Sequence, residues 1–168
     1  MNVVSTIDHP TSGNVSIDGQ DPHKMNDDEL AHFRRSTLGF VFQDFNLIHT
    51  LTVGENIMLP LTLEGIPVPE IKKRTEEVAK MLGIEQLLSK RTFEISGGQA
   101  QRTAVARAVV TNPSLLLADE PTGNLDKETQ AEIIEIFKEL AHKENKCIIL
   151  VTDSKEVSEQ SDVVYKLA

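Results

Sequence analysis

The stretch from Leu115 to Asp126 reads LLLADEPTGNLD, and it decides the fold class of this chain. Its first four residues form a continuous apolar run, which is typical of a short strand buried on both faces of a parallel sheet. Residues 127–144 then show helical spacing, and residues 147–152 form a second short apolar run. Strand, helix and strand in this order predict a βαβ unit, and therefore an α/β fold with a mostly parallel sheet.

Two carboxylates, Asp119 and Glu120, follow the first of these strands. Open α/β sheets bind their ligands at the carboxyl ends of the strands. Asp119 could hold Mg²⁺, directly or through water, because hard cations prefer oxygen ligands. Glu120 could accept a proton from an attacking water as a general base. The alternative is that the pair only ends the strand and starts a turn before Pro121.

A second polar motif lies upstream, where Ser96, Gly97, Gly98 and Gln99 precede a predicted helix over 99–110. Two glycines let a phosphate approach the backbone closely. The first turn of the helix presents free N–H groups and partial positive charge to an anion, and the Ser96 hydroxyl adds a donor. The alternative is an ordinary N-cap serine.

The remaining patterns predict a mixture of short strands and helices. Alternation over 14–19 predicts a strand that ends at glycine, and residues 38–43 predict a second strand rich in β-formers. Asn26 offers an N-cap for a helix over 30–35. Further helices are predicted at 52–63, 70–82 and 84–88, and the helix 99–110 is expected to bury Val105, Ala106, Val109 and Val110.

Composition narrows the class of protein. The chain has 168 residues, a net charge of −9 and 39% hydrophobic residues, as expected for one domain with a core of its own. The acidic balance disfavours direct binding to nucleic acid. The single cysteine, Cys147, excludes an internal disulfide and is expected to be a buried strand thiol in a reducing, cytoplasmic setting. No run approaches the length of a membrane helix, and the first residues do not show the charged-then-apolar pattern of a leader, so we expect any membrane link to run through a partner.

In order, these motifs resemble the signature motif, the Walker B motif and the D-loop of ABC-type ATPases. The resemblance runs from Met1 to about Lys166. It implies a P-loop NTPase-like ABC ATPase fold, with one domain over 1–168 and a small helical subdomain at about 48–96. Four segments look most like the group that serves lipoprotein-release, macrolide-export, cell-division and antimicrobial-peptide-resistance transporters. They are 10–13, 39–43, 55–57 and 123–126.

The resemblance also implies roles for two further residues. Gln43 matches the Q-loop glutamine, which reaches the metal and the attacking water and couples the site to a transmembrane partner. Asp126 matches the D-loop position, at the interface of a dimer. In this family two subunits sandwich two ATP molecules, and each site combines the Walker motifs of one chain with the signature of the other. The simpler alternatives are a polar strand end for Gln43 and an N-cap for Asp126.

Three departures from the family pattern stand out. The chain contains no Gly-Lys pair, so the phosphate-binding Walker A loop and the strand leading into it are absent from these residues. A sheet without that strand is expected to expose unpaired edges and apolar faces. Asp153 replaces the H-loop histidine, and its carboxylate would repel the γ-phosphate. Thr92 replaces a proline before the signature, which affects local rigidity.

These observations leave two main hypotheses. The first is an ATP-hydrolysing subunit that binds ATP and Mg²⁺, pairs with a second ABC subunit, and sits at the inner face of the cell membrane through an integral membrane permease. The second is a silent subunit or fragment that only lends its signature motif to a complete partner. ABC ATPases of DNA maintenance or translation are disfavoured. The segment 44–95 between Gln43 and Ser96 is too short and lacks the heptads of a coiled coil, and the chain has at most one such domain.

Overall fold

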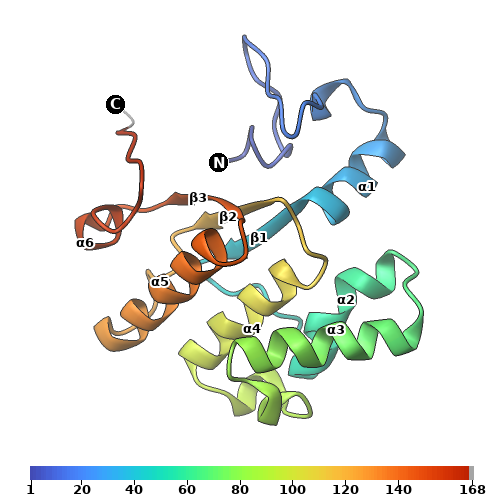
Figure 1. Cartoon of the computed structure of the whole chain (residues 1–168), viewed down its shortest axis with the longest axis vertical. Helices are drawn as coiled ribbons and strands as arrows, with labels where there is room; N and C mark the ends of the chain where they lie inside the picture. The colour runs from blue at the N-terminus through green and yellow to red at the C-terminus, as the bar shows by residue number, and fades with distance from the viewer. Residues whose placement is uncertain (167–168) are drawn as a thin grey trace.

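The computed structural model describes residues 1–166, and a parallel sheet of three strands lies at its centre (Figure 1). The strands are β1 (Leu38–Phe42), β2 (Leu115–Asp119) and β3 (Cys147–Val151), and β2 lies between the other two. The register aligns Phe42, Asp119 and Val151, so all three strands end at the same edge. The predicted α/β class and parallel sheet are confirmed.

Most predicted helices are present within a few residues of their expected bounds, but the helix predicted at 84–88 is only a 3-10 turn over Glu85–Leu87. Two of the N-caps, Asn26 and Thr52, form capping boxes. In each box the N-cap side chain accepts a hydrogen bond from a backbone N–H of the first turn, and the glutamate at that position accepts one from the N-cap backbone N–H. Short α6 (Lys155–Ser158) was not predicted. The longer helices are α1 (Asp27–Thr37), α2 (Val53–Leu63), α3 (Val68–Met81), α4 (Gly97–Val109) and α5 (Lys127–His142), with 3-10 turns η1 (Pro22–Lys24), η2 (Glu85–Leu87) and η3 (Thr92–Glu94).

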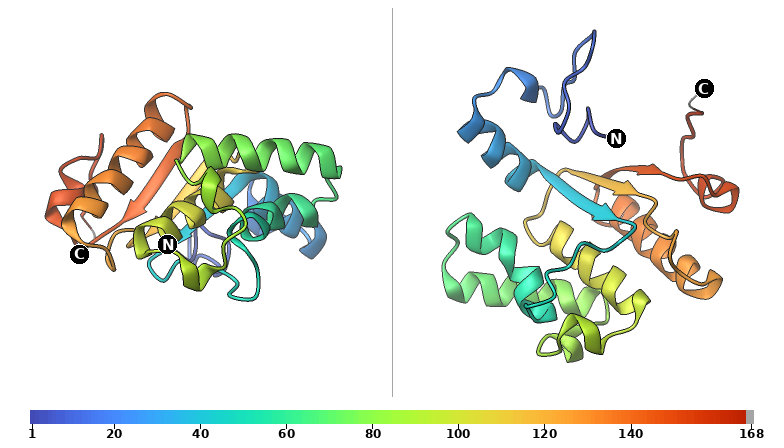
Figure 2. Two further views of the ribbon diagram at one scale, coloured as in Figure 1. Left: turned by 90° about the horizontal axis from the view of Figure 1, so that it is seen from below. Right: turned by 180° about the vertical axis from the view of Figure 1, so that it is seen from behind.

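One face of the sheet packs against the main apolar core. Leu116 and Ala118 of β2 point to this face, together with Val41 of β1. They meet α4 and α5, and α4 in turn packs against α2 and α3, as the two views in Figure 2 show. The expected burial of Val105, Ala106, Val109 and Val110 is confirmed. The boundary of a helical subdomain at about 48–96 remains a prediction.

The opposite face of the sheet is covered only in part. Leu38, Leu115 and Leu117 form a smaller core there with Phe33 of α1 and Ile17 of the N-terminal segment. This layer covers β1 and β2. The corresponding residues of β3, Cys147 and Ile149, are aligned with Leu115 and Leu117 but are exposed.

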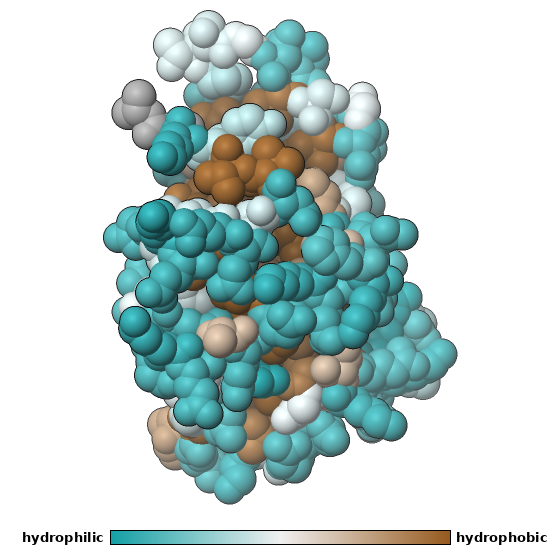
Figure 3. All heavy atoms as spheres, turned by 60° about the vertical axis from the view of Figure 1, so that its left-hand side comes forward, coloured by the Kyte–Doolittle hydropathy of each residue, from teal (hydrophilic) through white to brown (hydrophobic). Residues whose placement is uncertain are grey.

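The expectation that Cys147 is a buried thiol is therefore wrong, because the cysteine is exposed. The physical reason is the position of β3, which is an edge strand within residues 1–166 and lacks cover on this face. Exposed apolar groups also lie in the segment that follows, at Val163 and Val164. Figure 3 brings the side of α6 forward and shows apolar atoms at the surface in its upper part.

The predicted strand over 14–19 is not formed. The segment makes a tight turn in which Ile17 and Gln20 exchange backbone hydrogen bonds as an isolated bridge. Asp18 and Gly19 adopt positive φ values of 50° and 75° to close this turn. An alternating pattern needs a neighbouring strand to pair with, and none lies beside this segment within residues 1–166.

No helix within residues 1–166 has both the length and the apolar character needed to cross a lipid bilayer.

We expect Leu116→Ala to lower the free energy of unfolding by about 2–5 kcal/mol, because it opens a cavity in the main core. Leu116 is 1% exposed, whereas Leu63 at the end of α2 is 64% exposed. The matched control Leu63→Ala should therefore change stability by less than about 0.5 kcal/mol. Urea denaturation followed by circular dichroism measures both. Equal losses in the two variants would contradict the assignment of β2 to the centre of the core.

Candidate functional site

A polar hollow of about 240 Å³ lies at the carboxyl ends of β1 and β2. This is the edge of a parallel sheet where ligands are expected. The hollow brings together three residues that the sequence predicts to act on the metal and the attacking water: Gln43, Asp119 and Glu120. Its full lining is Phe42, Gln43, Asp44, Asn46, Asp119 and Glu120.

Glu120 is held firmly at this edge. Its backbone adopts a φ of 45°, and its N–H donates to the carbonyl of Val151 at 2.9 Å. Its Oε1 accepts a hydrogen bond from the backbone N–H of Asp153 at 2.7 Å, and its Oε2 accepts one from the Thr152 hydroxyl at 3.1 Å. Both bonds come from the residues just after β3, so the carboxylate is fixed in orientation beside the hollow.

Asp119 and Gln43 supply oxygen atoms that suit a hard cation. Asp119 is the last residue of β2, and Gln43 directly follows β1. The Nε2 of Gln43 donates to Oδ1 of Asn124 at 3.2 Å, which leaves the amide oxygen of Gln43 available as a ligand. No group of three His, Cys, Asp or Glu side chains that could hold a metal occurs within residues 1–166. This small oxygen set fits Mg²⁺, which proteins usually hold with one or two side chains, waters and substrate phosphates.

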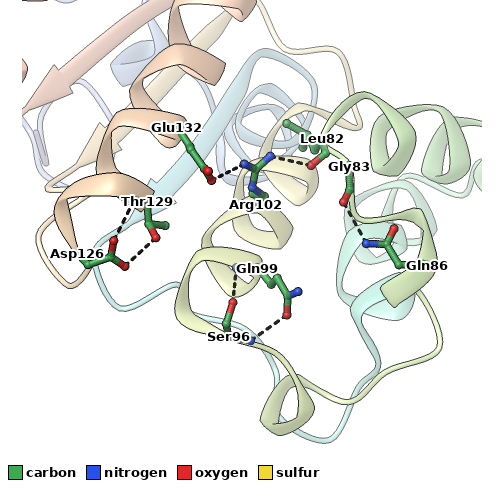
Figure 4. A network of polar contacts seen from close by, with 9 residues as sticks. All are labelled: Leu82, Gly83, Gln86, Ser96, Gln99, Arg102, Asp126, Thr129 and Glu132. Atoms are coloured by element: carbon green, nitrogen blue, oxygen red, sulfur yellow. Dashed lines mark hydrogen bonds and ion pairs between the residues drawn. The ribbon is translucent and has the colours of Figure 1, made fainter.

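The start of α4 carries Ser96, Gly97, Gly98 and Gln99, and none of these residues lines the hollow. Figure 4 shows Ser96 and Gln99 at this helix start. The Ser96 hydroxyl accepts from the backbone N–H of Gln99 at 3.3 Å, and the Gln99 side chain accepts from the N–H of Ser96 at 3.0 Å. Ser96 is thus an N-cap, as the simpler alternative held. Its hydroxyl hydrogen can still donate to an anion at this helix end.

The two glycines of this motif have different surroundings. A Cβ at Gly98 would lie 2.6 Å from Cγ2 of Thr129, so a side chain there would overlap Thr129 where α4 meets the start of α5. A Cβ at Gly97 would meet nothing closer than 3.7 Å. Packing therefore explains Gly98 but not Gly97, and the open side of Gly97 leaves the backbone accessible to a ligand.

Asp126 is the N-cap of α5 and lies beside the same junction. Its Oδ1 accepts from the backbone N–H of Thr129 at 3.1 Å, and its Oδ2 accepts from the Thr129 hydroxyl at 2.7 Å. The hydroxyl bond first, and then the backbone bond, lower the pKa of the Asp126 carboxyl from its ordinary value. Thr129 thus joins Asp126 to Gly98, and the structure gathers the predicted signature and D-loop residues at one exposed corner.

Sequence reasoning did not predict the supporting contacts that three polar residues make with these two groups, although Gln101 and Arg107 extend the signature-like pattern. Thr152 orients Glu120. Gln101 is fully buried, and its Nε2 donates to the carbonyl of Pro121 at 2.6 Å. Arg107 of α4 donates to backbone carbonyls in the loop after Gln43. A buried glutamine or arginine within an apolar helical pattern is the signal that could have pointed to two of them.

We expect Gly98→Ala to destabilise the protein by about 1–3 kcal/mol, because the new methyl group overlaps Thr129. Gly97→Ala should be neutral or stabilising by up to about 1 kcal/mol, because alanine favours a helix over glycine and meets no obstacle. Urea midpoints measure both changes. Thr129→Ser removes the obstructing methyl and should restore most of the stability of Gly98→Ala. A lack of rescue would show that another contact explains Gly98.

Comparison with known proteins identifies the family. The family model described as "ABC transporter" matches residues 1–123. The chain is 54% identical over 152 residues to the ABC transporter ATP-binding protein YxdL of Bacillus subtilis, an alignment that covers 90% of this chain and 59% of the relative. It is 41% identical over 166 residues to the bacitracin export ATP-binding protein BceA of Halalkalibacterium halodurans, covering 98% of this chain and 66% of the relative.

A solved structure agrees with these relatives. The dimeric, post-hydrolysis form of the ATP-binding cassette MJ0796 with ADP and Pi matches with a TM-score of 0.84 and 39% identity, over 96% of this chain and 71% of that chain. The present chain therefore spans about 59% of the length of its relative YxdL and has the cassette fold over almost all of its own length. The chain belongs to the ABC transporter family of ATP-binding domains.

Proposed function

We propose that this chain is part of the ATP-binding, ATP-hydrolysing subunit of an ABC exporter. The observation that carries the proposal is the separation of its polar residues into two groups. One group lines the hollow at the ends of β1 and β2, and the other lies at the exposed starts of α4 and α5. This division is what a sandwich of two subunits requires, in which each ATP contacts one group from each chain.

In this proposal the hollow serves the chain's own nucleotide. Bound Mg²⁺ and ATP supply the reactive phosphate and the positive charge that neutralises it. Asp119 and the amide oxygen of Gln43 hold the metal side of the site. Glu120, oriented by Thr152 and the N–H of Asp153, accepts a proton from the attacking water at a carboxylate oxygen.

The corner at α4 and α5 serves the nucleotide of the second subunit. Ser96 donates its hydroxyl, and the backbone N–H groups of Gly97 and Gly98 face the phosphates at the positive end of α4. Gln99 completes the cap, and Asp126 lies at the dimer interface.

We infer the partners and location from the same family. The second subunit is an ABC domain, the same or different, and an integral membrane permease holds the pair at the cytoplasmic side of the cell membrane. The names of the relatives support export, since BceA is described as a bacitracin exporter. The net charge of −9 does not favour nucleic acid as a direct partner.

Asp153 favours a second candidate function, a catalytically silent subunit that completes a partner's site. Its carboxylate replaces the imidazole expected to face the γ-phosphate, and its backbone N–H holds Glu120. The carboxylates of Glu120 and Asp153 would both repel a phosphate in the hollow and so oppose turnover there. They would affect binding at the distant start of α4, at Ser96 to Gln99, much less.

A fusion that joins a Walker A loop and its leading strand to Met1 tests the first candidate. We expect this fusion to bind Mg-ATP in calorimetry, and Glu120→Gln to slow hydrolysis by about 10²–10⁴-fold because the general base is lost.

In the same fusion, Asp153→His should raise the turnover of ATP with little change in the affinity for ATP. If turnover were the same with aspartate or histidine, the role assigned to Asp153 would be wrong.

The unfused chain tests the α4 corner. With Mg-ATP and a BceA subunit whose own catalytic glutamate is changed to glutamine, we expect co-elution on size exclusion. Ser96→Arg should abolish it, because the long side chain fills the phosphate-facing helix start. Ser89→Arg is the control, since Ser89 is also exposed and lies outside the motif. Co-elution that persists in Ser96→Arg, or that needs no ATP, would count against the sandwich.

A further inference from the structure

The loop after β1 contains two consecutive residues with left-handed backbone. Phe45 has a φ of 61° and Asn46 a φ of 47°. This conformation brings Cβ close to the following carbonyl oxygen, and it is less unfavourable for asparagine than for phenylalanine. Within the loop, only short turns support it: the N–H of Phe45 donates to the carbonyl of Phe42 at 3.2 Å, and that of Asn46 to the carbonyl of Asp44 at 2.6 Å. Contacts from outside must hold such a loop.

Arg107 of α4 provides the polar part of that support. Its Nη1 donates to the carbonyl of Asn46 at 2.5 Å, and its Nη2 donates to the carbonyl of Phe45 at 3.0 Å. The rigid, forked guanidinium can reach two neighbouring carbonyls at once. Within residues 1–166 no ion pair forms at Arg107, whereas Arg102 on the same helix pairs with Glu132. Burial lowers the pKa of the Arg107 guanidinium from its ordinary value.

Phe45 provides the apolar part. Its side chain packs against a small cluster on the same helix, formed by Ala100 and Ala104 with Leu47. The edge of its ring, at Cζ, lies 3.9 Å from the position that a Cβ would take at Gly97. The loop therefore reaches from the hollow to the first turn of α4, as its path beside α4 in Figure 2 shows.

Asn124 holds the other side of the same loop. Its Nδ2 donates to the carbonyl of Gln43 at 3.3 Å and to Oδ1 of Asp44 at 3.0 Å, while its Oδ1 accepts from Nε2 of Gln43. Gly123 leaves no room for a side chain, since a Cβ there would lie 2.7 Å from Nε2 of Gln43. The Gln43 amide is thus set between Asn124 and the loop that Arg107 restrains.

We propose that Arg107 is a positioning residue: it holds Phe45 and Asn46 in their left-handed conformation, and thereby fixes the Gln43 side chain at the hollow and joins it to the start of α4. The importance of Gln43 rests on the proposed function, but the restraint itself does not. A shift of α4 would move the Phe45 and Asn46 carbonyls through Arg107, and a shift of the loop would move the Phe45 ring beside Gly97.

The test uses the 168-residue chain, isotope-labelled, without nucleotide or metal. In Arg107→Gln we expect the side-chain amide signals of Gln43 and Asn124 to shift, and amide hydrogen exchange over 44–47 to accelerate about tenfold or more, with exchange in α5 unchanged. Arg102→Gln is the matched control on the same helix and should leave the loop signals in place. Because no ATP is present, a failure of the proposed function would not produce or hide this result.

A glycine substitution in the loop distinguishes two roles of Arg107: holding the loop backbone in its left-handed conformation, or only packing against the loop. Asn46→Gly in the Arg107→Gln background should return the Gln43 signal at least halfway, because glycine adopts positive φ without a Cβ clash. An unmoved Gln43 signal in Arg107→Gln, or no rescue by glycine, would overturn the proposal. If Arg107→Gln does not fold, Arg107→Lys provides the test instead. The lysine ammonium keeps the positive charge but lacks the forked guanidinium that donates to two carbonyls at once. If the signals of residues 44–47 and Gln43 shift in Arg107→Lys while the melting temperature is unchanged, the proposal is supported. If these signals do not shift, the proposal is overturned.

Discussion

Burial of β2 on both of its faces is the constraint on which the rest of the structure depends. Leu116 and Ala118 face the core of α4 and α5, while Leu115 and Leu117 face α1 and the N-terminal segment. A strand enclosed in this way cannot shift its register without exposing apolar side chains. Its carboxyl end is therefore fixed, and with it the place where Asp119 and Glu120 meet solvent. The hollow follows from this, because β1 ends level with β2 and delivers Gln43 to the same edge.

Helix α4 extends that constraint to the second group of polar residues. Its middle is fully buried at Ala104, Val105 and Ala106, so its first turn is held where Ser96 and Gly97 are exposed. Gln101 adds a bond to the carbonyl of Pro121, directly after Glu120. Its Oε1 is buried without a partner within residues 1–166, a cost that the fold accepts at the point where α4 meets the loop after β2. Helix α4 thus supports both candidate surfaces, which are the hollow at the ends of β1 and β2 and the exposed starts of α4 and α5.

The features predictable from sequence are those with local causes. Apolar runs located β1 and β2, and the Asn26 and Ser96 caps located two helix starts, because each cap acts within one turn. Burial of β3 was predicted wrongly, since an apolar run looks the same in a central strand and at an open edge, and only its neighbours decide whether Cys147 is covered. The strand expected at 14–19 failed for the same reason. Arg107 and Asn124 bond to residues 61 and 81 positions away, respectively, so a local pattern does not identify their partners.

The two candidate surfaces are separate in space but share their supports. Thr129 contacts Gly98 through its methyl group and Asp126 through its hydroxyl, which ties the start of α5 to the start of α4. Phe45 links that same turn of α4 to the loop that carries Gln43. Close-packed contacts of this kind transmit displacements because neither side can yield without opening a void or an overlap. A displacement of the first turn of α4 therefore bears on the Gln43 loop through the contact of Phe45 with the cluster that contains Ala100, and this is a physical reason for events at one surface to be felt at the other.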